Sequence, residues 1–241
     1  MMGWENEHLL GFDLETTGTD PEEARIVQYA FSWWDQGEHV STASYPVNPG
    51  VPIPDEAAAI HGFTDERVRA AMTHDQALDR IVAQLIDAGT QGVVLVGMNL
   101  AYDLTIVARR WAEMVGIDTV GKYLPPVVDV LVLDKHFDKY RKGRRNLGAL
   151  AEHYGVEVHD AHDAGADAAM SVGVFVAMLA TFPDLAATDP GALHELQRGW
   201  AMDQTVSYDE YRRKMGQAPL DLPAEGTWPI RLRPGTSAEV A

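Results

Sequence analysis

The sequence predicts an α/β fold around a mixed β-sheet, because strand patterns open the chain and strands then alternate with helices. Residues 8–15 alternate between apolar side chains on one face and acidic side chains on the other, which is the period of a strand. Residues 25–35 and 38–47 predict two further strands. Gln36-Gly37 between them is typical of a hairpin turn, so these strands should be antiparallel neighbours.

A helix and then a strand–helix pair follow. Thr73 and Gln76 form a capping-box pattern, and apolar residues at helical spacing continue after it. The composition of Val93–Gly97 indicates a buried strand. Asn99 is placed to cap the helix expected over 100–111.

The third part of the chain is expected to be largely helical. Residues 127–133 are apolar and fit either a strand or a helix. A short helix is expected from Asn146 to Gly155, where glycine suits the residue after a helix C-terminus. A long helix over 163–181 should end at Pro183.

A change of composition divides the chain after residue 182. Prolines and a glycine between 182 and 191 indicate a boundary, so residues 1–182 form the predicted main domain and 183–241 a C-terminal extension. The extension is predicted to be a helix or broken helix pair followed by a proline-rich end. We expect the helix to pack on the main domain, although Trp200 and Tyr211 could equally contact a partner.

Composition and charge exclude several classes of function. The chain has 241 residues, no cysteine and a formal net charge of −17, so disulfides, thiol catalysis and thiolate metal sites are excluded. An acidic protein does not coat nucleic acid by charge alone. Residues 135–145 contain six cations and one acid, and this basic strip fits either a phosphate track or a solvated loop.

No segment suggests a membrane protein. The longest apolar runs, such as 172–180, fall short of the roughly 18 residues that span a bilayer. The first ten residues lack a cationic region ahead of an apolar stretch. We therefore expect no signal peptide, no membrane anchor or membrane partner, and a cytoplasmic location.

Four carboxylates occupy positions where a core should be. Asp13 and Glu15 share one face of the first strand, and Asp103 and Asp167 lie near the core-facing sides of two helices. A single inward carboxylate is commonly structural, satisfied by a helix cap or an arginine. Four converging anions without adjacent cations would be destabilising, and hard divalent ions such as Mg²⁺ or Mn²⁺ would resolve the repulsion.

His162 lies five residues before Asp167, in the glycine- and alanine-rich segment that leads into the last long helix. A loop histidine is more often an ordinary surface residue. Its closeness in sequence to an expected metal ligand makes it a candidate base.

Three motifs resemble those of a known family. FDLETTG (12–18), NLAYD (99–103) and HDAGAD (162–167) are similar, in order and spacing, to the exonuclease motifs of DEDDh 3′–5′ exonucleases, such as the epsilon proofreading subunit of bacterial DNA polymerase III. IPDEAAAIHGFTDERV (53–68) also resembles that family. The resemblance covers about residues 8–181 and implies a ribonuclease H-like fold with a five-stranded mixed sheet flanked by helices.

The resemblance assigns a role to each matching residue. It implies that Asp13, Glu15, Asp103 and Asp167 bind two divalent metal ions, that His162 is the general base, and that Asp129 supports the site. The residues implied to seat the terminal nucleotide are Leu14, Thr16, His61 and Asn99. Met98 and Tyr102 depart from the histidine and phenylalanine usual in the family, which affects substrate preference more than activity.

The function implied is hydrolysis of DNA from a free 3′ end to nucleoside 5′-monophosphates, in proofreading or repair. A 3′–5′ exoribonuclease and a noncatalytic polymerase-accessory scaffold are the alternatives. Because the chain shows no polymerase module, proofreading would need a polymerase partner. Residues 217–222, QAPLDL, faintly resemble peptides that bind sliding clamps.

Overall fold

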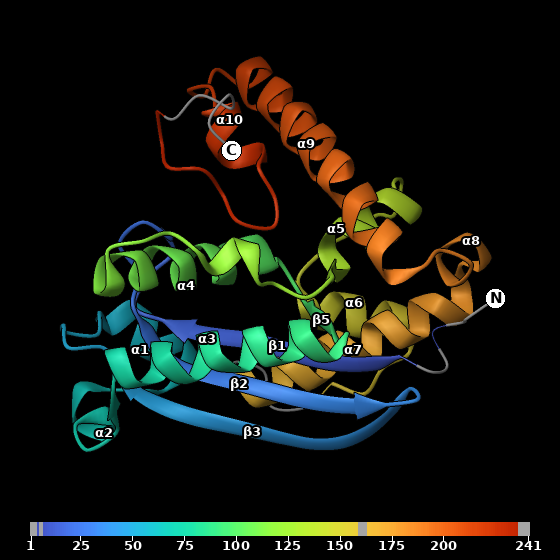
Figure 1. The fold of residues 1–241 in the computed structure, drawn as a ribbon. Coiled ribbons are helices and arrows are strands. Elements are labelled where there is room, and N and C mark those ends of the chain that lie inside the picture. The colour runs from blue at the N-terminus through green and yellow to red at the C-terminus, as the bar shows by residue number, and fades with distance from the viewer. Residues whose placement is uncertain (1–3, 5–6, 159–162, 236–241) are drawn as a thin grey trace.

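The computed structural model describes residues 4, 7–158 and 163–235, and its centre is a six-stranded mixed sheet in the order β4-β3-β2-β1-β5-β6 (Figure 1). The strands are β1 (His8–Thr16), β2 (Ile26–Asp35), β3 (Glu38–Asn48), β4 (Met72–Thr73), β5 (Val94–Gly97) and β6 (Val127–Asp129). The predicted α/β class and mixed sheet are confirmed. The strand beyond the expected five is β4, whose two residues are too few to show a period in the sequence.

Helices cover both faces of the sheet. They are α1 (Asp55–His61), α2 (Asp65–Val68), α3 (His74–Gln91), α4 (Leu100–Val115), the 3₁₀ turn η2 (Val120–Lys122), α5 (Val130–Phe137), α6 (Leu147–Tyr154), α7 (Ala164–Thr181), α8 (Pro183–Ala186), α9 (Pro190–Lys214) and α10 (Leu222–Gly226). One large apolar cluster joins the sheet to α3 and α4, and a second joins it to α6, α7 and α8.

The central strand β1 divides these two cores by the alternation of its side chains. Leu10, Phe12 and Leu14 belong to the cluster with α3 and α4, whereas Leu9 belongs to the cluster with α7. β1 pairs antiparallel with β2 and parallel with β5. Since side chains alternate along a strand, Asp13 lies on the α7 side, as the sequence pattern predicted.

Several local predictions are confirmed by backbone geometry. Gln36 and Gly37 both have positive φ, at 51° and 78°, which matches the twist of a two-residue hairpin. The capping box of Thr73 and Gln76 is present, and α6 ends at a left-handed Gly155. Residues 127–133, which fitted either a strand or a helix, contain one after the other: β6 ends at Asp129 and α5 begins at Val130.

Helix α7 lies against the sheet. Its 18 residues are long and apolar enough to cross a membrane by length and composition, but half of that stretch is buried inside the fold. It packs on β1, β2 and α6. These contacts are those of a core helix. The uninterrupted apolar run 172–180 is shorter than the apolar helix, which extends over Ala164–Thr181.

The C-terminal extension contains one continuous 25-residue helix, α9, and not a broken pair. The buried Gln197 donates from Nε2 to the Val127 carbonyl (2.9 Å) and accepts from the Asp129 amide (2.8 Å). Helix α9 therefore provides hydrogen-bond partners for backbone groups at the free edge of strand β6. Trp200 stacks on His136 with ring centroids 3.7 Å apart, whereas Tyr211 is exposed. The expected packing on the main domain is confirmed.

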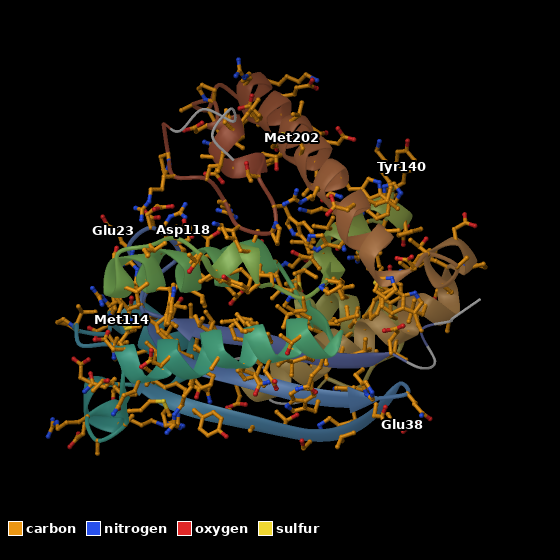
Figure 2. All side chains as sticks on the ribbon, in the orientation of Figure 1. Glu23, Glu38, Met114, Asp118, Tyr140 and Met202 are labelled. Atoms are coloured by element: carbon orange, nitrogen blue, oxygen red, sulfur yellow. The ribbon has the colours of Figure 1, made fainter. Side chains whose placement is uncertain are left out.

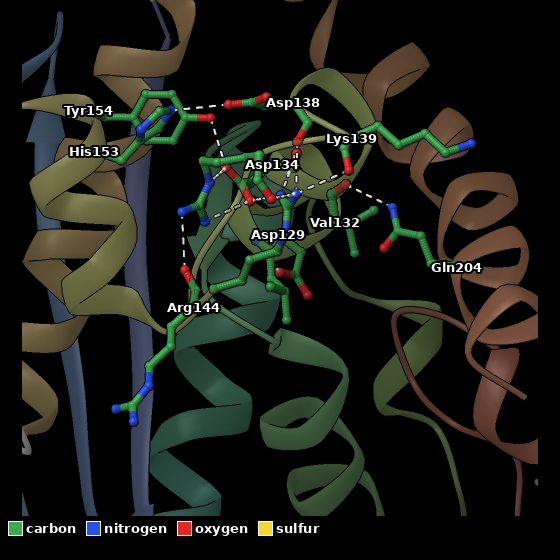
Figure 3. Close-up of polar contacts among 12 residues, drawn as sticks. Asp129, Val132, Asp134, Asp138, Lys139, Arg144, His153, Tyr154 and Gln204 are labelled. Atoms are coloured by element: carbon green, nitrogen blue, oxygen red, sulfur yellow. Dashed lines mark hydrogen bonds and ion pairs between the residues drawn. The ribbon is translucent and has the colours of Figure 1, made fainter. Parts of the chain in front are cut away.

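The basic strip at 135–145 is built around a buried acid, Asp134 (Figure 3). Arg141 donates to both carboxylate oxygens at 3.1 Å, the Arg145 guanidinium bonds the same carboxylate, and the Tyr154 hydroxyl donates at 2.9 Å. Two of the six cations are therefore structural. Tyr140 on the same loop points outward (Figure 2) and is 87% exposed.

Replacing Asp134 by alanine should destabilise the protein by about 3 kcal/mol, because two arginines would lose their shared buried counter-ion. Urea unfolding measures this loss. The control is Arg144→Ala: that side chain is exposed and its backbone carbonyl, which binds Arg141, is retained, so the change should stay within about 0.5 kcal/mol. Equal small losses in both variants would refute the structural role of the Asp134 cluster.

Candidate active site

Three acidic side chains from distant parts of the sequence meet beside β1. Asp13 and Glu15 come from the strand and Asp167 from the first turn of α7. One ligand oxygen of each lies within 4.8 Å of the others. The structure thus brings together three of the four carboxylates that the sequence singled out.

Small residues allow this approach of α7 to the sheet. A Cβ on Gly11 would lie 2.5 Å from the Ala168 carbonyl oxygen and 2.9 Å from a Val172 methyl, so only glycine fits. Ala30 of β2 packs on Ala164 and Ala168 of α7. The close packing holds Asp167 next to the strand acids.

The fourth carboxylate, Asp103, is 4% exposed and lies in the first turn of α4. It is outside the group of three, yet after burial its charge is the largest influence raising the pKa of Asp13. The Leu14 backbone amide hydrogen-bonds the Asp103 carboxyl. Asp103 therefore borders the cluster next to Asp13.

Burial and mutual repulsion disfavour the ionised form of these acids. The pKa values of Asp13 and Asp103 are both raised, first by burial and then by neighbouring carboxylates. The pKa of Glu15 rises to about 7 through burial, Asp167 and Asp163. This arrangement of acids is unfavourable, and a bound cation would reverse the repulsion.

The donor set fits a hard divalent cation. Every candidate ligand is a carboxylate oxygen, the donor type that Mg²⁺ and Mn²⁺ prefer. Asp13, Glu15 and Asp167 are close enough to share one ion. Asp103 lies beside Asp13, at the edge of this group of three.

Asp163 is a fifth acid at the site, and the sequence analysis did not select it. It is the N-cap of α7, where Oδ1 accepts from the Gly165 (2.9 Å) and Ala166 (3.2 Å) amides. Its Oδ2 accepts from the buried Gln28 side chain at 3.0 Å. An aspartate at the start of the predicted helix was the available signal, but its proximity to Asp13 and Glu15 depends on the tertiary structure.

Asn99 lies directly before α4 in the N-cap position, as expected, but its side chain makes no capping hydrogen bond. It has a left-handed backbone, φ 58° and ψ 36°, which is uncommon outside glycine. Its amide donates to Oδ1 of Asp129 at 2.9 Å, and Leu131 donates to the same oxygen at 3.0 Å. The predicted cap is therefore wrong in its bonding, and the buried Asp129 instead fixes the Asn99 backbone.

The four residues expected to seat a nucleotide line a single cavity of about 670 Å³. Glu15 also lines this cavity, so the cavity adjoins the carboxylate cluster. The lining residues are Leu14, Glu15, Thr16, Thr17, Gly18, Thr19, Pro54, Glu56, Ala57, Ile60, His61, Asn99, Tyr102 and Arg231. Arg231 comes from the C-terminal extension, which the motifs do not cover.

Two side chains fix the wall of this cavity. The Tyr102 hydroxyl lies 2.7 Å from Thr16 Oγ1 and also bonds the Gly18 carbonyl. A phenylalanine at position 102 could make neither bond, so this departure from the family pattern ties α4 to the end of β1. His61 is buried, and its Nδ1 accepts from the Phe63 amide at 3.1 Å.

His162, the expected base, lies outside the described residues. The described chain resumes at Asp163, directly next to it. Its role therefore stays a prediction.

Comparison with known proteins identifies the family. Residues 10–175, more than half of the chain, match the RNase T family model, described as exonuclease. The chain belongs to the exonuclease family. The family predicted from the three motifs is confirmed.

Relatives of this exonuclease domain are DNA polymerases. The chain is 27% identical over 157 residues to the PolC-type DNA polymerase III of Streptococcus suis and 28% identical over 159 residues to that of Clostridium perfringens. Each match covers 65% of this chain and 10% of the polymerase. The chain thus spans about a tenth of the length of these relatives.

Solved exonucleases share the fold. Escherichia coli exonuclease I in complex with a dA16 oligonucleotide has a TM-score of 0.63 at 18% identity, covering 88% of this chain and 45% of the other. Exonuclease X in complex with 5′-overhanging duplex DNA has a TM-score of 0.57 at 18% identity, covering 78% and 99%. A 3′-exonuclease that recognises a histone mRNA stem-loop has a TM-score of 0.57 at 18% identity, covering 73% and 83%.

The acid cluster should make the stability of the metal-free exonuclease domain depend on pH. Glu15 binds a proton more tightly in the folded state, with its pKa raised from the usual 4.5 to about 7, so its stabilising contribution is present below pH 4.5 and is lost as pH rises through 7. In EDTA, the melting temperature of the wild type relative to Glu15→Gln should therefore fall across this range. Added Mn²⁺ should stabilise the wild type increasingly over the same interval.

The matched control is Glu38→Gln, which removes an exposed glutamate at the β2–β3 turn (Figure 2) and should leave the pH dependence unchanged. A wild-type melting temperature that rises relative to Glu15→Gln between pH 4.5 and 7 would contradict the raised pKa.

Gly11→Ala should separate Asp167 from Asp13 and Glu15, because the new methyl group collides with the α7 backbone. We expect Mn²⁺ to bind about 10-fold more weakly by calorimetry and the free energy of unfolding to fall by about 1–3 kcal/mol. Gly148→Ala in α6 is the control, since a Cβ there meets no atom within 4 Å. Unchanged Mn²⁺ affinity in Gly11→Ala would show that the close packing does not hold the ligands.

Proposed function

We propose that this protein is a metal-dependent 3′–5′ exonuclease of the DEDDh class that hydrolyses DNA from its 3′ end to nucleoside 5′-monophosphates. The observation that supports this most directly is the carboxylate cluster of Asp13, Glu15 and Asp167 adjoining a nucleotide-sized cavity through Glu15. A strand that entered the cavity with its terminal nucleotide would have its last phosphodiester close to these acids.

The acids supply the ligands that hydrolysis of a phosphodiester requires. Asp13, Glu15 and Asp167 would hold one divalent ion, and Asp13 with Asp103 a second. Two such ions, when bound, neutralise charge on the phosphate and lower the pKa of a water molecule. The protein's part is to fix the ligand positions through the packing of β1 on α7 and to keep Asp103 buried beside Asp13.

His162 is proposed to accept the proton of the attacking water, because imidazole titrates near neutral pH. It precedes Asp163, whose carboxylate caps α7, by a single residue. Leu14, Thr16, His61 and Asn99 are proposed to bind the terminal nucleotide, since they line the cavity together. Asp129 supports them through the Asn99 amide.

DNA is the proposed substrate because the relatives are DNA polymerases and two structural neighbours hold DNA. An exoribonuclease is the second candidate, favoured by the neighbour that recognises an mRNA stem-loop. A noncatalytic scaffold would have no need of four clustered carboxylates. The PolC-type relatives support a replication or repair role with a polymerase partner, in the cytoplasm.

We do not extend this proposal to a sliding clamp. The Leu220 amide within 217–222 donates to Oδ1 of Asp209 at 2.7 Å, and Leu222 begins α10. Binding a clamp as an extended peptide would require this segment to detach from α9.

The test is hydrolysis of 5′-labelled single-stranded DNA and matching RNA with Mg²⁺ or Mn²⁺, with 3′-phosphate-blocked strands as controls. The wild type should give a ladder that shortens from the free 3′ end and is faster on DNA. Asp13→Asn should give none, because a ligand shared by both ions is lost. His162→Ala should reduce kcat by about 10²–10⁴ without weakening binding of the strand.

No cleavage of either strand by the wild type with any metal would refute the proposed exonuclease. Equal hydrolysis by wild type and Asp13→Asn would refute the two-metal assignment. A loss of binding that accounts for the whole effect of His162→Ala would make that histidine structural.

A further inference from the structure

The acidic character of the proposed nuclease site raises a question about how it binds a polyanion. The whole chain has a net charge of −17, and the cavity next to the carboxylate cluster is lined by two glutamates, Glu15 and Glu56. Among the lining residues, all of which the structure describes, Arg231 is the one with a permanent positive charge. This arginine belongs to the C-terminal extension and lies beyond the residues that match the exonuclease family.

The segment around Arg231 lies across the main domain as a strap, defined here as residues 227–233. Figure 1 shows it descending from α10 toward α4. Trp228 is 4% exposed and belongs to the core cluster of α3 and α4, and Ile230 packs against the same cluster. The strap is therefore anchored on the main domain on the N-terminal side of Arg231.

Helix α4 hydrogen-bonds both backbone polar groups of Arg231. Its amide donates to Thr105 Oγ1 at 2.9 Å, and its carbonyl accepts from Arg109 Nη2 at 2.7 Å. Both helix residues are fully buried, and Arg109 is itself fixed by two bonds to Glu22 at 2.8 and 2.9 Å. The same helix contains Asp103 in its first turn, so the strap and the acid cluster share one rigid support.

The side chain of Arg231 is not fully used by the fold. Nη1 pairs with Glu225 Oε2 at 3.3 Å, a contact between side chains that are 25% and 41% exposed. Its buried Nε has no hydrogen-bond partner in the part of the chain that the structure describes. A guanidinium has five donors in a planar fork suited to phosphate, and the partly exposed pair with Glu225 leaves part of this fork for an anionic ligand in the cavity that Arg231 lines.

We propose that Arg231 binds a backbone phosphate of the nucleic-acid strand, so that the C-terminal extension supplies the positive charge that the family motifs do not. This inference rests on the proposed exonuclease function. In the absence of nucleic acid, the Glu225 carboxylate pairs with the Arg231 guanidinium. When the nucleic acid binds, its phosphate takes the place of this carboxylate. The extension thereby becomes part of the substrate site.

The first test compares Arg231→Ala with Arg233→Ala, a variant of the same strap and the same charge change. Arg233 is exposed and does not line the cavity next to Glu15. Binding of a 5′-fluorescein dT12 oligonucleotide is followed by anisotropy in EDTA and in Ca²⁺, at several salt concentrations. Arg231→Ala should bind about 10-fold more weakly than the wild type, and its plot of log Kd against log salt should be shallower by about 0.7, the value for one phosphate contact.

Arg231→Lys should keep the salt dependence of the wild type, since the charge remains, with intermediate affinity. In Mg²⁺, Arg231→Ala should raise KM for the oligonucleotide about 10-fold while kcat changes less than about twofold, because the arginine does not touch the reacting atoms. A merely structural arginine would not separate KM from kcat in this way.

A second variant tests the same contact in the opposite direction. Glu225→Gln removes the competing carboxylate and should tighten binding about 3-fold, whereas Glu38→Gln, which removes the same charge at the β2–β3 turn, should not. The gain should disappear when Glu225→Gln is combined with Arg231→Ala, because the two side chains act as a pair.

The outcomes separate this inference from the proposed function. If the wild type degrades DNA but Arg231→Ala and Arg233→Ala bind and turn over alike, the role of Arg231 is refuted and the exonuclease stands. If Arg231→Ala alone loses affinity but no variant, including the wild type, releases nucleotides, the exonuclease is refuted and the phosphate contact stands. Wild-type protein that binds no oligonucleotide in either buffer would overturn the role of Arg231 directly.

Discussion

The structure depends on the convergence of acidic side chains where β1 meets α7. Asp13 and Glu15 on the strand and Asp167 on the helix lie within reach of one ion, although their charges repel. Tight packing compensates: the absent side chain of Gly11 and the small side chains of Ala30, Ala164 and Ala168 bring helix and sheet together. The packing thereby holds the three carboxylates close together despite their mutual repulsion.

Helix α4 connects the parts of the site. Its first turn places Asp103 beside Asp13, and Tyr102 holds the loop after β1 through Thr16 and Gly18. One and two turns further on, Thr105 and Arg109 hold the strap. One helix thus contacts the acids, the cavity wall and the extension.

The C-terminal extension is integrated into the main domain. Gln197 of α9 pairs with the backbone of edge strand β6, which protects that edge from pairing with another chain. Trp200 stacks on His136, and Trp228 enters the main core. Contacts therefore continue across the boundary predicted near residue 182.

The sequence by itself determined the fold class, the order of the longer elements and the family. Strand alternation over 8–15, the capping box at Thr73 and the three motifs all depend on local spacing, which a sequence records directly. Hydrophobic alternation also assigned Asp13 and Glu15 to the face that is not apolar. Local patterns could not show how closely β1 and α7 approach, because that distance depends on the packing of Gly11 against Ala168.

Only the tertiary structure decided the rest. The left-handed backbone of Asn99 is imposed by Asp129 thirty positions away, so the expected side-chain cap does not form. The sequence left the basic strip open between a phosphate track and a solvated loop, whereas in the fold Arg141 and Arg145 both pair with the buried Asp134. Arg231 reaches the cavity because α4 fixes its backbone, an interaction between residues more than 120 positions apart. Such contacts arise from packing, which depends on the whole chain and leaves no pattern in the neighbouring sequence.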